Sequence, residues 1–291
     1  MKPLCIFHGN CADGFGAAWA VRHFFGDKNI EFHAGLHGNA PPDTEGRDVV
    51  IVDFCYKRPV LDEMATGANS VLVLDHHKTA QDDLSDVDGP EDWHQWNASL
   101  SSDGVGGRLG AVFDMERSGA GLTWDFFFPD TARPKLLDHI EDRDLWQFKL
   151  DGTREIQAAL FSYPYDFDIW DEFMVLDDLS ELRTEGKTIE RKHFRDIGQL
   201  LGVCQRRLEI AGYNVPVANL PYTLTNDATH KMAEGEPFAA SYYDKEEGRV
   251  FSLRSTEDGL DVSEIAKTYG GGGHKHAAGF QVPRDHDLAK A

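Results

Sequence analysis

Short apolar runs that end in polar clusters dominate the first 80 positions of the chain. The runs at residues 4–7, 48–52 and 70–74 contain no polar alternation, which is typical of strands buried on both faces of a parallel sheet. Residues 17–21 and 58–67 lie between these runs and have helical composition. The alternation of strand and helix predicts an α/β fold built on a parallel sheet.

The rest of the chain shows other patterns. Residues 81–103 are acidic and rich in Trp and Ser, so we expect an irregular segment there, followed by helices near 107–118 and 132–140. Residues 178–211 carry mixed charges and an apolar stripe, which predicts a long connecting helix. The segments beyond it predict a smaller α+β domain with strands at 213–219, 238–243 and 249–255 and a helix at 264–269.

The length of 291 residues indicates two domains, because one domain takes roughly 100–200 residues. We expect an N-terminal parallel-sheet domain over residues 1–170, a helical linker over 171–212 and a C-terminal domain over 213–291.

Charge and composition narrow the class of protein. The chain has 50 Asp and Glu against 29 Lys and Arg, a formal net charge of −21, which argues against a protein that coats long duplex nucleic acid. No segment approaches the roughly 18 apolar residues of a membrane helix, so we expect no membrane partner. Four cysteines without a C-x-x-C pair predict reduced thiols and a cytoplasmic protein.

Polar clusters follow the predicted strands and one predicted helix. Taken singly, each cluster has a structural explanation, such as a turn, a helix cap or a hydrogen-bonded histidine. Together they converge on one edge of a sheet, where so many carboxylates and imidazoles require neutralising cations. Asp and His without several thiolates favour manganese, with magnesium, cobalt or iron as alternatives. The residues of these clusters are His8, Asp13, Asp53, Asp75, His76, His77, Asp142 and Asp144.

Two motifs resemble one known family. An Asp-His-His tripeptide at residues 75–77 follows Asp53 and the stretch His8–Gly14, in the order typical of the DHH phosphoesterase superfamily. Residues 270–280, with four glycines, a histidine and an Ala-Ala-Gly run, resemble the superfamily's DHH-associated C-terminal domain. The chain is most similar to the oligoribonuclease and RecJ-like branch. This resemblance implies a phosphoesterase domain and a smaller substrate-binding domain joined by a long helix.

The resemblance also implies roles for the matching residues. His8 would bind a first metal ion, Asp13 and His76 would bind a second, and Asp53 would bridge the two. Asp53 and His76 would be catalytic through these ions, and His77 would lie close to the scissile phosphate. Two ions held in this way suit the hydrolysis of a phosphoester.

The remaining polar residues near these ligands have less direct roles or open alternatives. Asp75 would orient the neighbouring imidazoles instead of binding metal. The last carboxylate ligand is either Asp142 or Asp144, and the spacing to the following Leu-Trp pair favours Asp142. Cys11 departs from the family pattern, because an aspartate is typical there. Three alternatives follow. The thiol is a soft ligand, which would make the site sensitive to oxidation, or it is a bystander, or the first metal is held weakly by His8, Asp53 and water.

The glycine cluster near the C-terminus has two interpretations. Four consecutive glycines usually form a flexible loop. Before a histidine and a run of small residues, they indicate a packed backbone surface whose N–H groups meet an anion. The resemblance makes Arg254 a clamp on the terminal phosphate of the substrate. The expected substrate-binding residues are Arg254, Ser255, Gly271, Gly272, Gly273 and His274.

The activity implied by the resemblance is that of a metal-dependent phosphodiesterase or exonuclease with two Mn²⁺ ions. It would hydrolyse short oligonucleotides or linear dinucleotides to nucleoside monophosphates. The alternatives are a phosphomonoesterase for 3′-phosphoadenosine-type nucleotides, a polyphosphate hydrolase and a non-catalytic nucleotide-binding sensor. The family also leads us to expect a homodimer. One of Trp19, Phe54, Tyr56 and Trp146 could stack on a base, which spacing alone does not decide.

Overall fold

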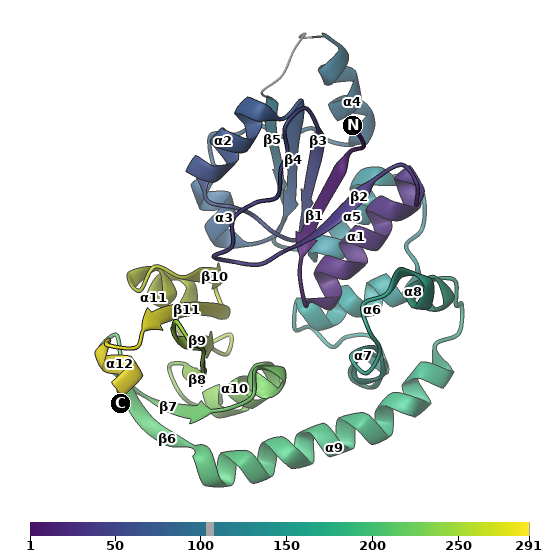
Figure 1. The fold of residues 1–291 in the computed structure, drawn as a ribbon. Coiled ribbons are helices and arrows are strands. Elements are labelled where there is room, and N and C mark those ends of the chain that lie inside the picture. The colour runs from purple at the N-terminus through teal and green to yellow at the C-terminus, as the bar shows by residue number, and fades with distance from the viewer. Residues whose placement is uncertain (103–107, 291) are drawn as a thin grey trace. The chain divides into compact units, whose positions relative to one another are not determined.

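The computed structural model describes residues 1–102 and 108–290 (Figure 1). The chain folds into two compact units, Met1–Glu190 and Arg191–Ala291. Each unit has a hydrophobic core of its own. Over the described ranges, no helix combines the length and the apolar composition that crossing a lipid bilayer requires.

The N-terminal unit is built on a five-stranded parallel sheet. Its strand order is β2-β1-β3-β4-β5, and every neighbouring pair runs parallel. This confirms the α/β fold with a parallel sheet that the apolar runs predict. The strands are β1 (Leu4–His8), β2 (Glu31–Gly35), β3 (Asp48–Val52), β4 (Ser70–Asp75) and β5 (Arg108–Phe113).

Helices form most of the connections between these strands. Further helices form most of the segment that follows β5. Residues 81–103 are not irregular as expected, because the last turn of α3 and the whole of α4 lie within them; Asp103 lies outside the described residues. The helices are α1 (Ala12–Phe25), α2 (Arg58–Gly67), α3 (Lys78–Asp83), α4 (Trp93–Ser102), α5 (Gly119–Phe127), α6 (Lys135–Asp144), α7 (Thr153–Leu160), α8 (Phe167–Met174) and α9 (Ser180–Cys204).

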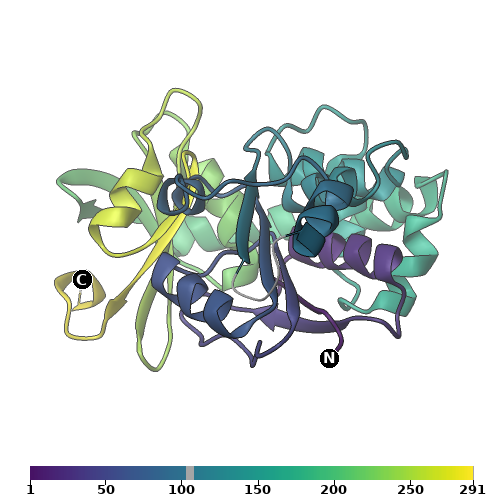
Figure 2. The same ribbon diagram turned by 90° about the horizontal axis from the view of Figure 1, so that it is seen from above.

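Both faces of the parallel sheet are buried, which accounts for the unbroken apolar runs. Val50 and Leu72 belong to the core that the sheet forms with α1 and α5. Their neighbours Val49 and Val71 point to the opposite face and belong to the core under α2. Figure 2 shows α1 and α2 on opposite sides of the strands. Each such side chain contributes about 1.5–3 kcal/mol by leaving water.

The prediction of a helix near residues 107–118 is wrong. Residues Arg108–Phe113 form the edge strand β5, and Gly107 lies outside the described residues. Gly110 weakens the strand signal in this segment. A Cβ at this position would lie 2.6 Å from the ring of Trp96, so the packing of α4 on the sheet requires glycine. The other edge strand, β2, has no prediction because its sequence, Glu-Phe-His-Ala-Gly, contains no apolar run.

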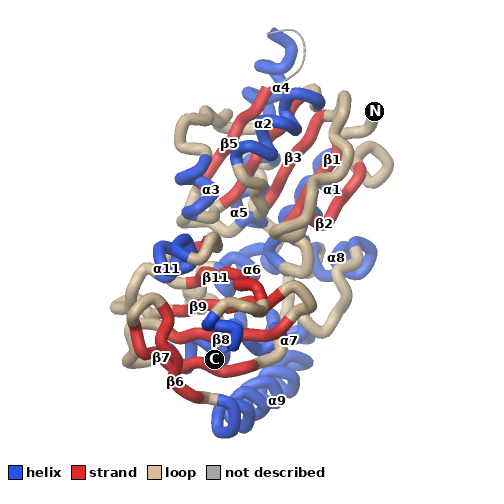
Figure 3. The backbone as a smooth tube through the Cα atoms, turned by 60° about the vertical axis from the view of Figure 1, so that its left-hand side comes forward, coloured by secondary structure: helices blue, strands red, loops and turns tan. Residues whose placement is uncertain are grey.

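The C-terminal unit contains a six-stranded sheet in the order β10-β11-β9-β8-β7-β6 (Figure 3). Only the pair β7 and β8 runs parallel among these neighbours. This mixed sheet confirms the smaller α+β domain. Its elements are β6 (Arg206–Ile210), β7 (Tyr213–Asn219), the 3₁₀ turn η1 (Tyr222–Leu224), α10 (Thr225–Ala233), β8 (Ala239–Asp244), β9 (Gly248–Arg254), α11 (Val262–Thr268), β10 (Gly272–His274), β11 (Ala277–Pro283) and α12 (Asp287–Lys290).

The connecting helix is shorter than the predicted 178–211. It is α9, which ends at Cys204, and the following residues form the strand β6. A tight turn leads from β6 into β7 through Ala211 (φ +51°) and Gly212 (φ +84°). Two left-handed residues are what a two-residue hairpin turn requires. Ala at the first of these positions gives no sequence signal for such a turn. The predicted helix therefore follows the apolar stripe beyond Cys204 and includes the strand β6.

We expect Gly186→Ala, in α9, to destabilise the N-terminal unit. The new Cβ would lie 1.6 Å from the carbonyl oxygen of Glu155 at α7, and overpacking of this kind costs about 1–3 kcal/mol. Gly198→Ala is the matched control in the same helix, because among residues 1–102 and 108–290 no heavy atom apart from the adjacent backbone of α9 lies within 4 Å of its Cβ position. Alanine should stabilise that site by up to about 1 kcal/mol. Calorimetric melting of both variants checks this, and an unchanged melting temperature for Gly186→Ala would contradict it.

Candidate metal centre

The carboxyl ends of three neighbouring strands bring the predicted polar residues together. His8 is the last residue of β1, and Asp53 follows β3 directly. Asp75 is the last residue of β4, with His76 and His77 behind it. Because β1, β3 and β4 are adjacent and parallel, their carboxyl ends lie at one edge of the sheet, where ligand sites form in open α/β folds.

Asp53 lies at the centre of this cluster. Its φ of +52° is in the left-handed region, which Asp tolerates better than most residues. Oδ1 lies 3.2 Å from Nε2 of His76, and Oδ2 lies 3.5 Å from Nδ1 of His8. Oδ2 is buried and has no hydrogen-bond partner among residues 1–102 and 108–290. A cation at this place would satisfy an oxygen whose burial is otherwise costly.

The first turn of α5 packs tightly against Asp53. A Cβ at Gly119 would lie 2.4 Å from the Cβ of Asp53, so only glycine allows this approach. The N–H groups of Gly119 and Ala120 donate to the two carboxylate oxygens of Asp13 at 2.6 and 2.9 Å. Asp13, on α1, is thereby fixed beside Asp53 by the amino end of a neighbouring helix.

One set of potential ligands consists of His8, Cys11 and Asp53. One ligand atom from each lies within 4.8 Å of the others. Burial opposes protonation of His8, but the adjacent side chains of Asp53 and Cys11 raise the pKa of His8 well above its usual value. Burial, together with the charge of Asp53, raises the pKa of the Cys11 thiol. The residue that departs from the family pattern therefore lies where a soft ligand could act.

A second set consists of Asp13, His76 and Asp144, again with ligand atoms within 4.8 Å of one another. Nε2 of His76 lies 3.5 Å from Oδ2 of Asp13 and 3.5 Å from Oδ2 of Asp144. Together with Asp53, three carboxylates surround one imidazole nitrogen. The side chain of Asp144 is 29% exposed, so this set is reached from solvent.

The pKa shifts in this cluster show how strongly its charges interact. Burial, joined by the charges of Asp53 and Asp144, raises the pKa of Asp13 well above its usual value. Burial also acts on Asp53, but His76 and His8 outweigh it and hold the pKa of Asp53 well below its usual value. The pKa values of two neighbouring carboxylates thus move in opposite directions, which is the pattern of crowded acids.

This donor set fits divalent cations. Mixed carboxylate oxygens and imidazole nitrogens suit manganese, magnesium or cobalt, and a cation would relieve the repulsion among the carboxylates. Asp53 belongs to the set with His8 and Cys11 and contacts His76 of the set with Asp13 and Asp144. Its two oxygens could therefore serve two ions, as in sites that hydrolyse phosphoesters.

Asp75 holds the histidines that follow it. Its side chain is fully buried, and Oδ1 accepts a hydrogen bond from the backbone N–H of His76 at 2.8 Å. The same oxygen lies 2.7 Å from Nδ1 of His77. These contacts fix the orientation of the His77 ring, so that its Nε2 is the nitrogen turned away from Asp75.

The structure places Asp144 in the cluster and Asp142, the preferred candidate, outside it. The two residues are two positions apart on α6, so their side chains leave the helix in different directions. Oδ1 of Asp142 accepts from the N–H of Lys149 at 2.7 Å, and Oδ2 accepts from the hydroxyl of Thr153 at 2.6 Å. Asp142 therefore anchors the loop after α6, while Asp144 joins the cluster.

His37 joins the cluster without a sequence signal. It follows β2, the edge strand that no apolar run predicts. Its ring centroid lies 5.4 Å from that of His8 and 4.8 Å from that of Phe54. Burial, together with the charges of His8 and His77, lowers the pKa of His37 to about 4, so this imidazole is neutral at pH 7. Only the pairing of β2 with β1 reveals its position.

Two predicted substrate-binding residues lie at the end of β9 in the C-terminal unit. Nε of Arg254 donates to the side-chain oxygen of Asn226 on α10 at 2.8 Å, which orients the guanidinium. Ser255 is buried, and its hydroxyl donates to the carbonyl oxygen of Leu260 at 2.7 Å and lies 2.9 Å from Nδ1 of His276. Ser255 thus has a place in the packing of its own turn.

The glycine cluster of this unit is ordered backbone. Residues Gly272–His274 form the strand β10, which pairs antiparallel with β11. A Cβ at Gly271 would lie 2.1 Å from the carbonyl oxygen of Gly279. Gly273 has a φ of +139°, which residues with a side chain rarely adopt. The glycines therefore allow a close approach of two chain segments.

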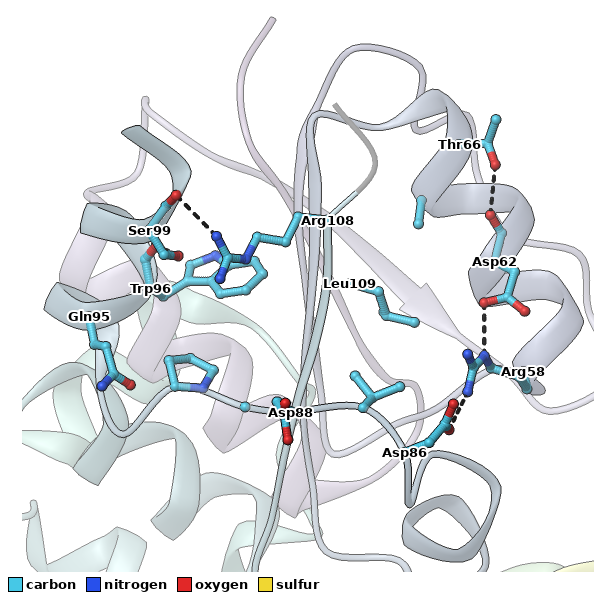
Figure 4. A pocket seen from close by; sticks show the side chains of 14 residues that line it. Arg58, Asp62, Thr66, Asp86, Asp88, Gln95, Trp96, Ser99, Arg108 and Leu109 are labelled. Carbon is cyan, nitrogen blue, oxygen red and sulfur yellow. Dashed lines mark hydrogen bonds and ion pairs between the residues drawn. The ribbon is translucent and has the colours of Figure 1, made fainter. Parts of the chain in front are cut away.

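A cavity of about 530 Å³ lies in the N-terminal unit at the amino end of β5, where α2 and α4 line it (Figure 4). Arg58 pairs there with Asp62 and Asp86 at 2.8 and 2.5 Å. The guanidinium of Arg108 lies over the ring of Trp96, 5.4 Å from its centroid. Both guanidinium groups thus contact other residues of the cavity wall. The cavity lies at the end of β5 opposite to the cluster around Asp53.

Comparison with known proteins identifies the C-terminal region. The family model described as the DHHA1 domain matches residues 226–291. The chain is 31% identical over 304 residues to Uncharacterized protein R106 of Acanthamoeba polyphaga mimivirus. This match covers 95% of the chain and 66% of that relative, so the chain spans slightly less than two thirds of the relative's length.

Solved structures show more distant likenesses. RecJ from Thermus thermophilus in complex with Mn²⁺ is 16% identical, and the match covers 97% of this chain and 50% of that chain, with a TM-score of 0.47. The pGpG-specific phosphodiesterase PggH from Vibrio cholerae is 17% identical, with 100% and 96% covered and a TM-score of 0.36. At TM-scores below 0.5, these likenesses assign neither a substrate nor a metal to this chain.

We expect Mn²⁺ to raise the melting temperature, because an ion that binds only the native state stabilises it by about 2.7 kcal/mol at 100 times its Kd. Asp144→Asn should reduce this rise. Asp142→Asn is the matched control: it should lower the melting temperature without ions, since it weakens the anchor of the loop after α6, but keep the rise. Melting curves with Mn²⁺ and with EDTA test the pair. A rise lost in Asp142→Asn and kept in Asp144→Asn would contradict the assignment.

The two histidines with raised pKa values predict a pH dependence. The stabilisation from protonated His8 and His76 is fully present below their usual pKa of about 6.5 and is lost as the pH rises through the raised native values. The ion-free chain should therefore lose stability above about pH 6.5. Ion binding needs deprotonated imidazoles, so the rise caused by Mn²⁺ should grow over the same range. Melting curves at several pH values measure both trends, and a rise that shrinks with pH would refute the ligand role of these histidines.

Proposed function

We propose that the chain, with a DHHA1 domain at residues 226–291 and an Asp-His-His cluster in its N-terminal unit, is a metal-dependent phosphodiesterase of the DHH phosphoesterase superfamily. Its proposed substrates are short oligonucleotides or linear dinucleotides, which it hydrolyses to nucleoside monophosphates. The observation that supports this most directly is Asp53, whose oxygens each approach a different histidine.

The residues of the N-terminal unit have distinct parts in this proposal. His8 and Asp53, with Cys11 beside them, would hold one ion, and Asp13, Asp53, His76 and Asp144 would hold the other. When bound, two Mn²⁺ ions supply Lewis-acid activation of a water and neutralise charge on the phosphate.

His77 would contact the phosphate directly. Asp75 binds its Nδ1 side, which leaves Nε2 as the donor to a phosphate oxygen when the ring is protonated. His37, held neutral, adds no positive charge that would compete with an ion near His8. No covalent intermediate with the chain is needed, because a water molecule is the nucleophile.

The C-terminal unit would bind the terminal phosphate of the substrate through Arg254, His274 and the glycine backbone at 271–273. A guanidinium matches phosphate oxygens in its fork geometry, and the hydrogen bond from Arg254 to Asn226 supports a fixed orientation. An acidic chain with a few placed cations suits a small substrate better than a long duplex. All four cysteines are free thiols, which supports a reducing, cytoplasmic setting.

Incubation with Mn²⁺ tests the proposal against its alternatives. A labelled 5′-phosphorylated dinucleotide should yield nucleoside monophosphates, and a labelled short RNA should show which end is attacked. A 3′-phosphoadenosine nucleotide and polyphosphate should remain intact. Turnover of only these last compounds would replace the proposal by a phosphomonoesterase or a polyphosphate hydrolase. No turnover of any substrate, with nucleotide binding retained, would indicate a sensor.

Asp53→Asn should lower turnover of the dinucleotide by about 10³-fold or more, since metal catalysis contributes several kcal/mol and 1.36 kcal/mol corresponds to a factor of ten. Asp48→Asn is the matched control, at the opposite end of β3, where Asp48 accepts a hydrogen bond from Ser70 at 2.8 Å. It should leave turnover within about twofold. Equal activity of the two variants would refute the role of Asp53.

A further inference from the structure

The loop between α6 and α7, together with the helix ends beside it, carries a cluster of arginines and aromatic rings. The guanidinium of Arg143 lies 4.5 Å from the ring centroid of Trp146 and 5.7 Å from that of Phe161. The guanidinium of Arg154 lies 3.5 Å from the ring centroid of Phe148. The rings of Trp146 and Phe148 meet edge to face at 5.0 Å. Two cations are thus layered on three rings.

The backbone of this loop is held in a rare conformation. Trp146 has a φ of +58° and Phe148 a φ of +49°, and bulky residues seldom adopt this left-handed region. The carbonyl oxygen of Asp142 accepts from the N–H of Gln147 at 2.9 Å and from that of Phe148 at 3.2 Å. With the contacts of its carboxylate, Asp142 fixes both ends of the loop. Strain maintained in this way is frequent at ligand-binding sites.

The rings of this cluster remain partly open to solvent. Trp146 and Phe148 are half-buried, and Phe161 is 49% exposed. The tryptophans on α1 and α5, Trp19 and Trp124, are by contrast 4% exposed and belong to the core. A core role therefore explains Trp19 but not the rings of the loop.

In the sequence, this cluster of arginines and rings is next to a residue of the candidate metal centre. Asp144, whose carboxylate lies 3.5 Å from His76, stands between Arg143 and Trp146 in the sequence. The loop therefore begins directly after a residue that the proposed function assigns to an ion.

We propose that Arg143, Trp146, Phe148 and Arg154 form a nucleotide-binding platform, in which a ring stacks on a base and the guanidinium groups bind phosphate oxygens. This inference rests on the proposed function and names the part of the N-terminal unit that recognises a nucleotide. Bases of any kind stack on aromatic rings, so the platform favours nucleotides without selecting one base. A guanidinium stacked by its face keeps its N–H donors in the plane of the group, where phosphate oxygens can meet them.

The platform is tested with two ligands that cannot be hydrolysed to smaller nucleotides, AMP and ribose 5-phosphate. They share a phosphate and differ in the base. In calorimetric titrations of the full chain with Mn²⁺ present, the wild type should bind AMP about 10-fold more tightly than ribose 5-phosphate. Trp146→Leu should remove this preference, and Trp146→Tyr should restore most of it. Arg154→Gln should weaken both ligands to a similar extent.

The matched control is Arg108→Gln, which removes another arginine stacked on a tryptophan of the same unit. It should change neither affinity. The stabilisation by Mn²⁺ should persist in Trp146→Leu, because the variant keeps Asp144. Equal binding of both ligands by the wild type, an unchanged preference in Trp146→Leu, or loss of the Mn²⁺ effect in that variant would overturn the platform and leave the loop as a support for Asp144.

Failure of the platform and failure of the proposed function give different results. A chain that binds AMP through Trp146 but cleaves no dinucleotide would refute the phosphodiesterase and keep the platform. A chain that cleaves dinucleotides but binds AMP and ribose 5-phosphate equally would do the reverse.

Discussion

Crowding of negative charge at the carboxyl edge of the parallel sheet is the constraint on which the N-terminal unit depends. Asp13, Asp53 and Asp144 surround Nε2 of His76 at distances of 3.2–3.5 Å. Such a cluster is unfavourable without cations, yet the backbone is shaped to build it. Asp53 occupies a left-handed turn, and Gly119 lets the first turn of α5 approach it. Burial of apolar side chains on both faces of the sheet offsets this unfavourable repulsion. The crowding of carboxylates gives a donor set suited to divalent ions.

The end of α6 shows how two neighbouring acids acquire different functions. Asp144 faces the charged cluster, while Asp142 accepts hydrogen bonds from the loop that follows. The same helix end therefore places a potential ligand and shapes the layer of rings and guanidinium groups beside it. In a chain with a net charge of −21, arginines held on aromatic rings give a local positive site for phosphate. This arrangement is consistent with a small, phosphate-bearing substrate.

Much of the fold and of the candidate site follows from local sequence patterns. The unbroken apolar runs predicted β1, β3 and β4, and the polar residues behind them predicted the cluster of His8, Asp53 and His76. The failures have physical causes. The strand β5 contains Gly110, which lowers strand propensity but is required where Trp96 packs. The strand β2 gave no signal, and His37 was missed with it, because an edge strand needs no continuous apolar run.

The sequence by itself determined which residue types stand at the carboxyl ends of the buried strands. Burial on both faces requires an unbroken apolar run, so the polar residues that follow a run mark the end of its strand. It also indicated a family resemblance, through short motifs at residues 75–77 and 270–280. Only the tertiary structure placed Asp144, and not Asp142, beside His76, and only it separated Trp146 from the aromatic residues of the core. Both choices depend on the direction in which a side chain leaves its helix or loop, and that direction is set by packing between segments far apart in the sequence.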